Sequence, residues 1–370
     1  MKNIEVKKIN FFQGNNNNFH KQPPVIDLTN NHRIKKILIV KWGALGDLLI
    51  SSAIMNDIYN AFPEAKIDLN TSPEFTGLFF KDKRFFNVWS FDVRNPRFKI
   101  LEHMKWLNNV RKYKYDLIID LQTNDHSRFL FSLVKLLGLN APTFMLGNHS
   151  VYPYNIRYQR KSNIRHSFDI QRTAISSIGI TPSTNHPILN INNKDVKEAN
   201  SLLKKYSLSN NKYIIFIPGS NLKGKLKRWG VSNYRELSLI ISQSMKQEIV
   251  LIGGKDDTEE CLGIAVNNPN IINLCNLTKI SHLPEIFRQS SLIISSDTGT
   301  AHLSGLSNTV TLLITGPTDP IKVMPIGQNI FAIQPDIKCK NCYLKICDHH
   351  SCMVNLKPLD VLKFINRIVS

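Results

Sequence analysis

Short apolar runs that end in polar, glycine-containing turns recur along this chain, and they constrain its fold more than any other feature. Residues 291–295 (Ser-Leu-Ile-Ile-Ser) form one such run, and residues 296–302 (Ser-Asp-Thr-Gly-Thr-Ala-His) follow it. Leu303 and Leu306 then have the spacing of a helix. A buried strand, a polar turn and a helix start are where an α/β protein presents backbone N–H groups to an anion. The segment therefore suggests a site for a phosphorylated ligand, although an Asp N-cap beside a turn glycine would look the same.

A second segment of this kind lies near the N-terminus. An apolar strand at 35–40 leads into Gly43 and Gly46, and a helix follows that Pro63 ends. Glycines at such a turn let a ligand approach the backbone closely. They do not form the dinucleotide fingerprint Gly-x-Gly-x-x-Gly, because they are three residues apart and Asp47 follows at once. Asp47 either complements the helix dipole or acts as a general base facing a cleft.

The alternation of strands and helices predicts two doubly wound α/β domains. Residues 1–33 are polar and Asn-rich, and we expect a disordered or irregular extension there. The first domain spans 34–187, the second spans 188–357, and a terminal helix occupies 358–370. The run 128–138 is apolar on most sides and is expected to be a core helix rather than a membrane contact. The predicted strands are 35–40, 66–70, 116–121, 213–217, 248–252, 271–274, 291–295 and 309–314.

The ordered motifs resemble those of glycosyltransferase family 9, the heptosyltransferases. The two segments above take part in this resemblance, which covers roughly residues 34–369. It implies the GT-B fold, with two Rossmann-like domains facing a cleft, an acceptor-binding first domain and a nucleotide-sugar-binding second domain. The terminal helix would cross back to the first domain. The other matching motifs are 115–122 (Tyr-Asp-Leu-Ile-Ile-Asp-Leu-Gln), 216–221 (Phe-Ile-Pro-Gly-Ser-Asn), 227–229 (Lys-Arg-Trp), 249–254 and 315–320.

The resemblance implies transfer of a heptose from an ADP-activated donor to a lipopolysaccharide-type glycolipid acceptor. We expect an inverting displacement that needs no metal and no other cofactor for catalysis. Nothing in the residues themselves distinguishes ADP from another nucleotide, so a GT-B transferase that uses another nucleotide sugar stays an alternative. A non-catalytic basic protein that binds nucleic acid or anionic surfaces is an alternative from another class.

Glycosyl transfer needs a base for the acceptor hydroxyl, and Asp47 is the candidate, with Gly43 and Gly46 in the acceptor-side loop. The departing diphosphate needs cations and N–H donors. By resemblance, Lys227 corresponds to the family's phosphate-contacting lysine and is expected to act in catalysis. From the sequence alone, it could equally be a solvated cation of the lysine-rich loop. The candidate donor-binding residues are Ser220, Asn221, Asp297, Thr298, Gly299 and His302, with Asp297 and His302 matching the family's donor-site pair.

Three details of the donor domain stay open in the sequence. A carboxylate for the donor ribose should come from Asp256, Asp257 or Glu259, and the pattern does not decide among them. Gly224 and the neighbouring lysines suggest a longer phosphate loop than usual. Trp229 is expected to pack against the helix that begins near Ser232 rather than to bind ligand.

The chain of 370 residues has a net charge of +19. No apolar run approaches the roughly 18 residues of a membrane helix, and the N-terminus lacks a signal peptide's apolar core, so we expect a cytoplasmic protein. The charge favours transient contact with an anionic membrane, peripheral on its inner face. Nucleic acid is not expected as a partner, since no nucleic-acid-binding motif is present. The basic, aromatic segment Tyr152–Arg165 could meet lipid headgroups or nucleic acid, or it could be a solvated loop.

Four cysteines near the C-terminus, Cys339, Cys342, Cys347 and Cys352, lie within fourteen residues. In a cytosolic protein such clustering favours metal or redox chemistry over structural disulfides. The spacing is not that of a zinc ribbon, so a structural zinc, free thiols and a disulfide all stay open. Cys261 and Cys275 are isolated and are expected to be small buried hydrophobes.

Overall fold

The computed structural model describes residues 4–8, 25–92, 99–138, 140–147, 151–158, 164–208 and 213–369. The chain divides into two compact units, one of Gln13–Asn190 and one of Met1–Phe12 with Ile191–Ser370. The division at 190 lies close to the boundary that the sequence predicts at 187.

The N-terminal unit contains, in its described residues, a five-stranded parallel sheet in the order β4-β3-β2-β5-β6. The three strands predicted for this unit are present. The sequence analysis did not predict β4 (Asn-Val-Trp-Ser), which has two apolar residues, or β6 (Phe-Met-Leu-Gly), which has three. The strands are β2 (Lys36–Val40), β3 (Lys66–Thr71), β4 (Asn87–Ser90), β5 (Leu117–Asp120) and β6 (Phe144–Gly147).

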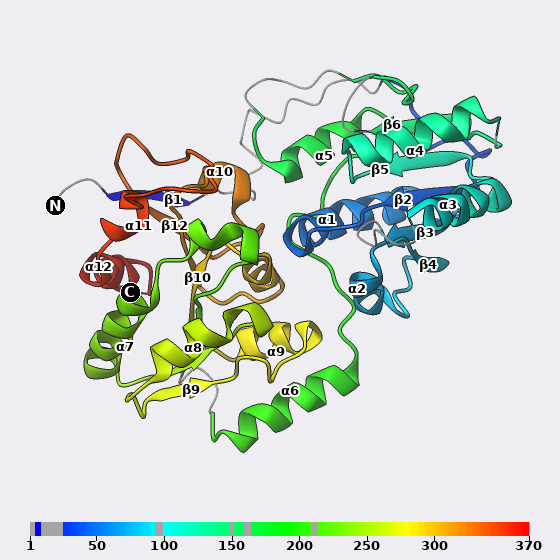
Figure 1. Cartoon of the computed structure of the whole chain (residues 1–370). Helices are drawn as coiled ribbons and strands as arrows, with labels where there is room; N and C mark the ends of the chain where they lie inside the picture. The colour runs from blue at the N-terminus through cyan, green and yellow to red at the C-terminus, as the bar shows by residue number, and fades with distance from the viewer. Residues whose placement is uncertain are drawn as a thin grey trace. The chain divides into compact units, whose positions relative to one another are not determined.

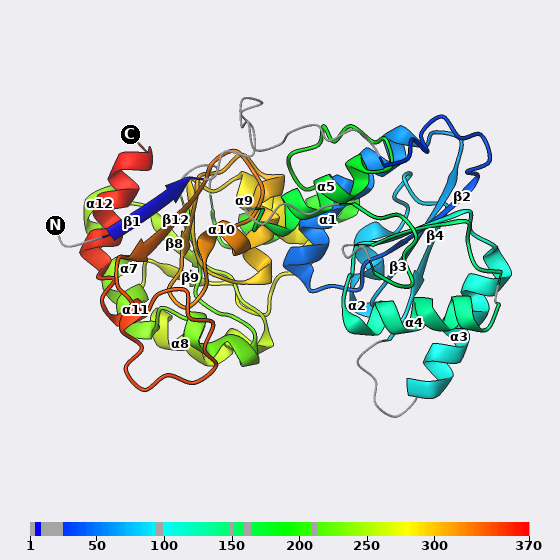
Figure 2. The ribbon, with the colours of Figure 1, turned by 90° about the horizontal axis from the view of Figure 1, so that it is seen from above.

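Helices cover both faces of this sheet (Figure 2). On one face, α3 and α4 pack against β2, β5 and β6 through a core that contains Trp106 and Phe131. On the other face, α1 packs against α5. The helices are α1 (Leu45–Ala61), α2 (Pro73–Thr76), the short 3-10 helix η1 (Gly77–Phe79), α3 (Lys99–Tyr113), α4 (Asp125–Leu136) and α5 (Ser167–Ser176).

Helix α4 confirms the core helix predicted around 128–138, but it is apolar on an exposed side as well. Leu130, Phe131 and Val134 are fully buried, whereas Phe129 is 56% exposed and Leu136 is 72% exposed. The helix therefore both fills the core and presents apolar side chains to solvent.

The C-terminal unit contains, in its described residues, a seven-stranded sheet in the order β1-β12-β11-β10-β7-β8-β9. Its edge strand β1 and the neighbouring β12 are labelled in Figure 1. All neighbours are parallel except β1, which runs antiparallel to β12 with Ile4 opposite Pro335. The strands are β1 (Ile4–Lys8), β7 (Tyr213–Ile217), β8 (Glu248–Leu251), β9 (Ile271–Asn273), β10 (Leu292–Ser296), β11 (Thr311–Ile314) and β12 (Ile330–Pro335).

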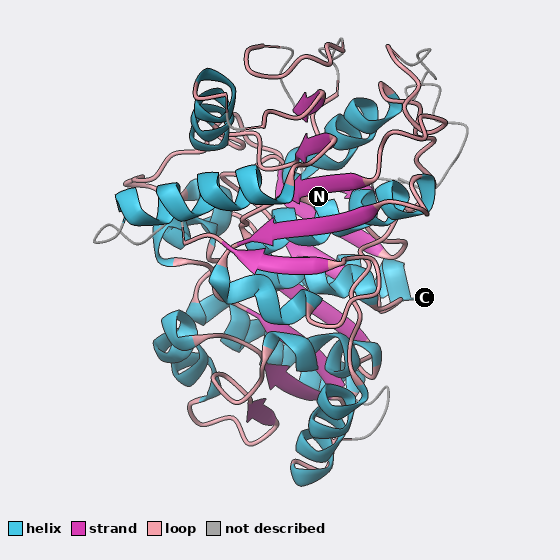
Figure 3. Cartoon of the chain, turned by 90° about the vertical axis from the view of Figure 1, so that its right-hand side faces the viewer, coloured by secondary structure: helices cyan, strands magenta, loops and turns pink. Residues whose placement is uncertain are grey.

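Figure 3 distinguishes the helices, strands and loops of the chain by colour. Every strand predicted for this unit is present, while β1 and β12 were not predicted. The helices are α6 (Asn193–Lys205), α7 (Val231–Met245), α8 (Thr258–Ala265), α9 (Leu283–Arg288), α10 (Pro320–Val323), α11 (Ser351–Val354) and α12 (Pro358–Val369), with 3-10 helices η2 (Leu222–Lys227), η3 (Lys255–Asp257), η4 (Ile280–His282) and η5 (Gly299–Leu306).

Two predictions about the chain ends need correction. The irregular extension predicted for 1–33 is wrong for Ile4–Lys8, which pairs with β12 as an edge strand. Residues 25–33 contain no helix or strand, yet they pack on the N-terminal unit, where the Val25 N–H donates to Ser177 O at 2.9 Å and Leu28 is fully buried. Backbone pairing at a sheet edge needs no apolar run, so composition did not reveal it. The Asn15–Asn18 run lies outside the described residues.

The terminal helix α12 is an integral part of the C-terminal unit rather than a separate segment. It packs against α7 and buries Val361, Phe364 and Ile365 in that unit's core. The predicted crossing of this helix to the first domain stays a prediction.

Candidate functional site

The donor-side motifs come together at one edge of the C-terminal sheet. Strands β7, β10 and β11 are neighbours and parallel, so their carboxyl ends lie at the same edge. The loops that leave these ends carry Pro218–Lys227, Asp297–His302 and Thr315–Asp319, respectively. Ligands of open α/β sheets bind at such carboxyl ends. The Ser296 Oγ donates to Pro218 O at 2.9 Å and connects the end of β10 to the loop after β7.

Lys227 and Asp297 form an ion pair at this edge. The Lys227 Nζ lies 2.9 Å from the Asp297 Oδ2, and the two side chains are 28% and 6% exposed. This separation is that of a charge-assisted contact between an ammonium and a carboxylate. Because the Lys227 side chain is 28% exposed, part of it stays accessible to solvent while Asp297 holds its ammonium.

The loop that carries Lys227 closes around Gly224. The Ser220 Oγ donates to Gly224 O at 2.7 Å, and the Gly224 N–H donates to Asn221 O at 2.8 Å. A Cβ on Gly224 would lie 3.1 Å from Asn221 Oδ1 and 3.4 Å from both Lys227 Cδ and Ser220 Oγ. Gly224 therefore lies close to Ser220, Asn221 and Lys227, three residues that the sequence places in the site. The Ser220 hydroxyl hydrogen is therefore engaged by Gly224 O.

Arg228 braces the base of the same loop, a role that the sequence did not reveal. Its guanidinium donates to Ser220 O at 2.7 Å, to Asp257 Oδ1 at 2.9 Å and to Glu260 Oε2 at 2.8 Å. Burial raises the pKa of both carboxyls, and the charge of Arg228 opposes that rise. A Cβ at Gly219 would overlap the Asp257 carboxylate. The Asp257 carboxylate therefore holds Arg228 and packs against Gly219 of this loop, whereas Asp256 and Glu259 are exposed.

The turn after β10 begins η5, with Thr298 as its N-cap residue and Gly299 as its first residue. The first N–H groups of a helix have no acceptor within it, so this end can bind an anion. Thr298 and Gly299 are partly exposed, and His302 is buried at 8% exposure within η5. Trp229 confirms its predicted packing role, because it is 2% exposed and its ring packs edge-on against Tyr234 of α7, with ring centroids 5.1 Å apart.

The acceptor-side residues lie at the carboxyl end of β2, the central strand of the N-terminal sheet. Gly43 has a φ of +136°, and a Cβ there would lie 2.8 Å from the Phe75 ring, so only glycine suits the position. Gly46 is buried in the first turn of α1. Asp47 follows it on the exposed side of that turn. Its carboxylate is therefore accessible to a substrate.

A buried lysine accompanies Asp47, and the sequence analysis overlooked it. Lys41 is 5% exposed, and its Nζ donates to Leu121 O at 3.1 Å. Burial lowers the pKa of Lys41, while the charges of Asp47 and Asp120 oppose that change. Its place in the sequence could have revealed this burial, because Lys41 directly follows an apolar strand and precedes the glycine turn.

Asp120, at the end of β5, organises the neighbouring loop rather than facing solvent. It is 1% exposed and accepts hydrogen bonds from the Gln122 and Thr123 N–H groups, the Ser127 Oγ and the Tyr154 hydroxyl. Tyr154 and Tyr158 are both buried, so part of the basic, aromatic segment is core. Arg160 and Lys161 of that segment lie outside the described residues.

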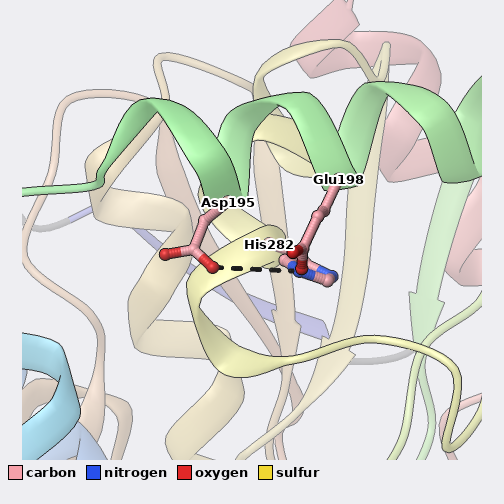
Figure 4. A group of neighbouring side chains, drawn as sticks. All are labelled: Asp195, Glu198 and His282. Carbon is pink, nitrogen blue, oxygen red and sulfur yellow. Dashed lines mark hydrogen bonds and ion pairs between the residues drawn. The ribbon is translucent and has the colours of Figure 1, made fainter.

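Asp195, Glu198 and His282 form the one group in the described part of the chain whose ligand atoms lie close enough to suggest a metal (Figure 4). The His282 Nε2 is 3.0 Å from Glu198 Oε2 and 4.0 Å from Asp195 Oδ1. The Lys279 ammonium lies 2.6 Å from the same Glu198 oxygen and already supplies a cation. These contacts therefore hold α6 against η4, and the lysine occupies the charge of Glu198 that a metal would need.

The four clustered cysteines are all free thiols in this structure. Cys339 and Cys342 are exposed, Cys347 is partly exposed and Cys352 is buried. Together with His349 and His350 they line one cavity of about 40 Å³. No three of their ligand atoms lie within 4.8 Å of one another among the described residues. Thiol and imidazole ligands suit a thiophilic metal. In this structure, however, the side chains do not form a compact tetrahedral site.

Two α/β units, each built around a mainly parallel sheet, have the architecture of the GT-B fold. Solved structures agree: the chain aligns with a family 9 glycosyl transferase from Veillonella parvula with a TM-score of 0.74 and 16% identity, covering 90% of this chain and 97% of that chain. With E. coli heptosyltransferase WaaC the TM-score is 0.67 and the identity 19%, covering 90% of this chain and 99% of that one.

The sequence identifies the family. The model of glycosyltransferase family 9 (heptosyltransferase) matches residues 103–352, and the chain belongs to this family. A lipooligosaccharide heptosyltransferase 2 of Campylobacter jejuni is 35% identical over 170 residues, which are 44% of this chain and 53% of the relative. The match therefore spans about half the length of that relative. Among the described residues, no helix combines the length and the apolar character needed to cross a membrane.

Proposed function

We propose that this protein transfers a heptose from an ADP-activated donor to a lipopolysaccharide-type glycolipid by inverting, metal-independent displacement. The observation that carries the proposal is the Lys227–Asp297 ion pair, which places a cation beside the start of η5. A cation and helix N–H groups on one side of a loop suit a diphosphate. E. coli WaaC has been solved with ADP and with ADP-2-deoxy-2-fluoro heptose, which supports this choice of donor.

In this mechanism the donor side stabilises the leaving group. Lys227 neutralises part of the diphosphate charge, which grows as the glycosidic bond breaks. The N–H groups around Thr298 and Gly299 donate to the phosphate oxygens, and Asp297 holds the lysine in place. His302, buried in the same turn, and Asn221, exposed in the opposite loop, complete the donor-binding set.

The acceptor side supplies the base. Asp47 takes the proton of the acceptor hydroxyl, whose oxygen then attacks the anomeric carbon from the face opposite the diphosphate. One bond to oxygen forms as the other breaks, so the anomeric configuration inverts. Both units must act on the same sugar for this step to occur.

Two observations support catalysis without a metal. Lys227 already supplies a cation beside the proposed diphosphate site. The adjacent acidic pair Asp256-Asp257 is a poor metal clamp, because Asp257 accepts from Arg228 and from the Gly254 N–H at 3.0 Å.

We also propose transient contact with the cytoplasmic face of an anionic membrane, where a glycolipid acceptor would be met. The net charge of +19 favours such a surface. Helix α4 presents Phe129, Leu136 and the adjacent Leu137, exposed at 56%, 72% and 58%, beside the exposed Arg128. Apolar side chains next to a cation suit a headgroup boundary. Flotation with vesicles of anionic lipid should capture the protein, and Phe129→Ser with Leu136→Ser should reduce that capture.

The decisive experiment is an assay of purified protein with ADP-heptose and a heptose-deficient glycolipid, read by mass spectrometry. We expect a mass gain of one heptose, and Asp297→Ala should lose donor binding. Transfer from a different nucleotide sugar, with none from ADP-heptose, would support the alternative donor. Absence of both transfer and nucleotide-sugar binding would favour a non-catalytic basic protein.

A further inference from the structure

Two cysteines that look isolated in the sequence lie side by side in the C-terminal unit. Cys261 is on α8, and Cys275 follows β9. A Cβ at Gly253, which follows β8, would lie 3.2 Å from the Sγ of Cys261 and 3.2 Å from the Sγ of Cys275. Cys261 is buried, as the sequence predicts, whereas Cys275 is partly exposed, and both are free thiols. Two separate elements therefore bring a pair of thiols against one glycine.

The two thiols have different surroundings. The Cys275 Sγ donates to Gly254 O at 3.3 Å. Burial raises the pKa of both thiols, and the hydrogen bond between them raises the pKa of Cys261 further while it lowers that of Cys275. Such a bond has Cys261 as donor, because a donated hydrogen stabilises the thiolate of Cys275. Cys275 is thus the more accessible thiol, with a second thiol directly beside it.

The pair contacts the loop after β8, residues 252–257. Strand β8 is parallel to β7 and lies next to it, so this loop leaves the same edge of the sheet as the donor-side motifs. Two backbone bonds join this region to the chain that leaves β9. The Leu274 N–H donates to Leu251 O at 3.0 Å, and the Asn276 N–H donates to Gly253 O at 3.1 Å. The thiol contact with Gly254 adds a third connection.

The same loop supports the donor-side loop after β7. The Gly254 N–H donates to the Asp257 Oδ2 at 3.0 Å. The Asp257 Oδ1 accepts from Arg228 at 2.9 Å, and Arg228 also donates to Ser220 O at 2.7 Å. A chain of direct contacts therefore runs from the thiol of Cys275 to a candidate donor-binding residue, although neither cysteine belongs to the donor-binding set.

We propose that Cys261 and Cys275 are a redox-active pair, which hydrogen peroxide converts to a disulfide, and that this disulfide loosens the loop after β8 and weakens donor binding. The thiolate of Cys275 attacks one peroxide oxygen, the O–O bond breaks, and the hydroxide that leaves takes up the proton that the thiol lost. The sulfur of Cys261 then attacks the resulting sulfenic acid, so the S–S bond forms, the S–O bond breaks and a second water leaves. The two thiols lose two electrons in total, and the peroxide is reduced to two waters.

The loosening follows from the contacts of Cys275. Once its sulfur is bonded to that of Cys261, it carries no hydrogen, and Gly254 O loses its donor. The sulfurs also move toward each other and away from their places around Gly253. Because the N–H of Gly254 holds Asp257, the support of Arg228 weakens with it. The weaker donor binding rests on the proposed function; the disulfide and the loosened loop do not.

The test uses the full chain, reduced with dithiothreitol and then exposed to hydrogen peroxide at about pH 7 and about pH 8. Free thiols are alkylated before digestion. Trypsin releases both cysteines in one peptide, 256–279, because no lysine or arginine lies between Lys255 and Lys279. Mass spectrometry should show this peptide without alkylation and two hydrogens lighter than the dithiol form. Since the thiolate attacks and burial raises its pKa, the disulfide should form about tenfold faster at the higher pH.

Two measurements follow the consequence in the same samples. Amide hydrogen exchange in peptides covering 252–258 should rise about fivefold on oxidation, while peptides of β11 should not change. Calorimetry with ADP should show affinity reduced about threefold or more. Dithiothreitol should reverse both effects.

Cys275→Ser is the matched control, because its hydroxyl can still donate to Gly254 O but cannot form the disulfide. This variant should bind ADP as the reduced chain does, and peroxide should leave its exchange in 252–258 and its ADP affinity unchanged. Any effect of peroxide that persists in the variant comes from the four clustered cysteines, Cys339, Cys342, Cys347 and Cys352.

Three results would overturn the proposal. The first is a peptide 256–279 that stays a dithiol or is oxidised to a sulfinic acid without an S–S bond. The second is unchanged or slower exchange in 252–258 once the disulfide is present, and the third is ADP affinity that the disulfide does not alter. A disulfide with faster exchange, in a chain that binds no ADP in either state, would instead leave the redox pair standing and refute the proposed function.

Discussion

The ammonium of Lys227 lies 2.9 Å from the carboxylate of Asp297, and this pair joins the loop after β7 to the turn after β10. The carboxylate is buried while the lysine is 28% exposed, so the lysine is anchored on one side and accessible on the other. A partly exposed ion pair adds little to stability. We infer that its main effect is to place the cation for a ligand.

Replacement of this cation should affect both binding and rate. We expect Lys227→Ala to weaken donor binding and to lower turnover, each by about tenfold or more, because the diphosphate charge is present in the ground state and grows in the transition state. Lys225→Ala is the matched control, since Lys225 is an exposed lysine in the same loop. Donor calorimetry and single-turnover kinetics provide the measurements. If both constants stay unchanged, Lys227 is only a loop cation.

The candidate base makes a different prediction. Asp47→Asn should lower turnover at least about a hundredfold while donor affinity is nearly kept, because the change removes a proton acceptor without touching the donor unit. Asp125→Asn is the control, since Asp125 is also an exposed acid in the first turn of a helix of the same unit. Near-normal turnover of Asp47→Asn would exclude it as the base.

The sequence predicted the parts of the fold that depend on local pattern. Apolar runs such as Tyr213–Ile217 form buried strands because periodicity and turn residues suffice to specify them. Strand β1 was missed because its sequence, Ile-Glu-Val-Lys-Lys, has no strong apolar signal and depends on the free edge of β12. Tertiary contacts of this kind are not encoded locally.

In the candidate site, too, the sequence predicted what depends on local motifs and missed what depends on tertiary contacts. The motif residues Lys227 and Asp297 could be named from the sequence, but their direct contact could not. Arg228 appeared only as part of a motif, and its bonds to Asp257 and Glu260 depend on two loops that meet in the folded unit. Lys41 was missed because a lysine normally indicates a surface position, and only the packing around β2 reveals its burial.

Removal of Mg²⁺ tests the metal-independent mechanism. Turnover at saturating donor should be unchanged within about twofold when Mg²⁺ is omitted and traces are chelated, because Lys227 and helix N–H groups carry the charge stabilisation. The metal content of the protein should be measured in the same samples, so that loss of an ion bound by the four clustered cysteines is not mistaken for a Mg²⁺ effect. Activity that disappears and returns only with added Mg²⁺ would contradict this mechanism.

Loss of Arg228 should destabilise the C-terminal unit in a pH-dependent way. Arg228→Ala leaves the carboxylates of Asp257 and Glu260 without their cation, and both are largely buried. Breaking such a partly buried network should lower the free energy of unfolding by about 3 kcal/mol near neutral pH. Arg235→Ala, an exposed arginine on α7, should change it by less than about 0.5 kcal/mol.

The sign of the pH dependence follows from the two carboxyls. Burial raises the pKa of Asp257 and of Glu260 in the folded state, and Arg228 limits that rise. A group with a raised folded pKa favours folding most below its unfolded pKa, and this contribution is lost as the pH rises through the folded value. Without Arg228 both folded pKa values rise further, so the variant loses more stability over that interval. Urea unfolding at about pH 4.5 and pH 7.5 should therefore give a smaller difference between variant and wild type at the lower pH. A difference that is equal at both values, or larger in acid, would show that Arg228 acts through packing rather than through these carboxylates.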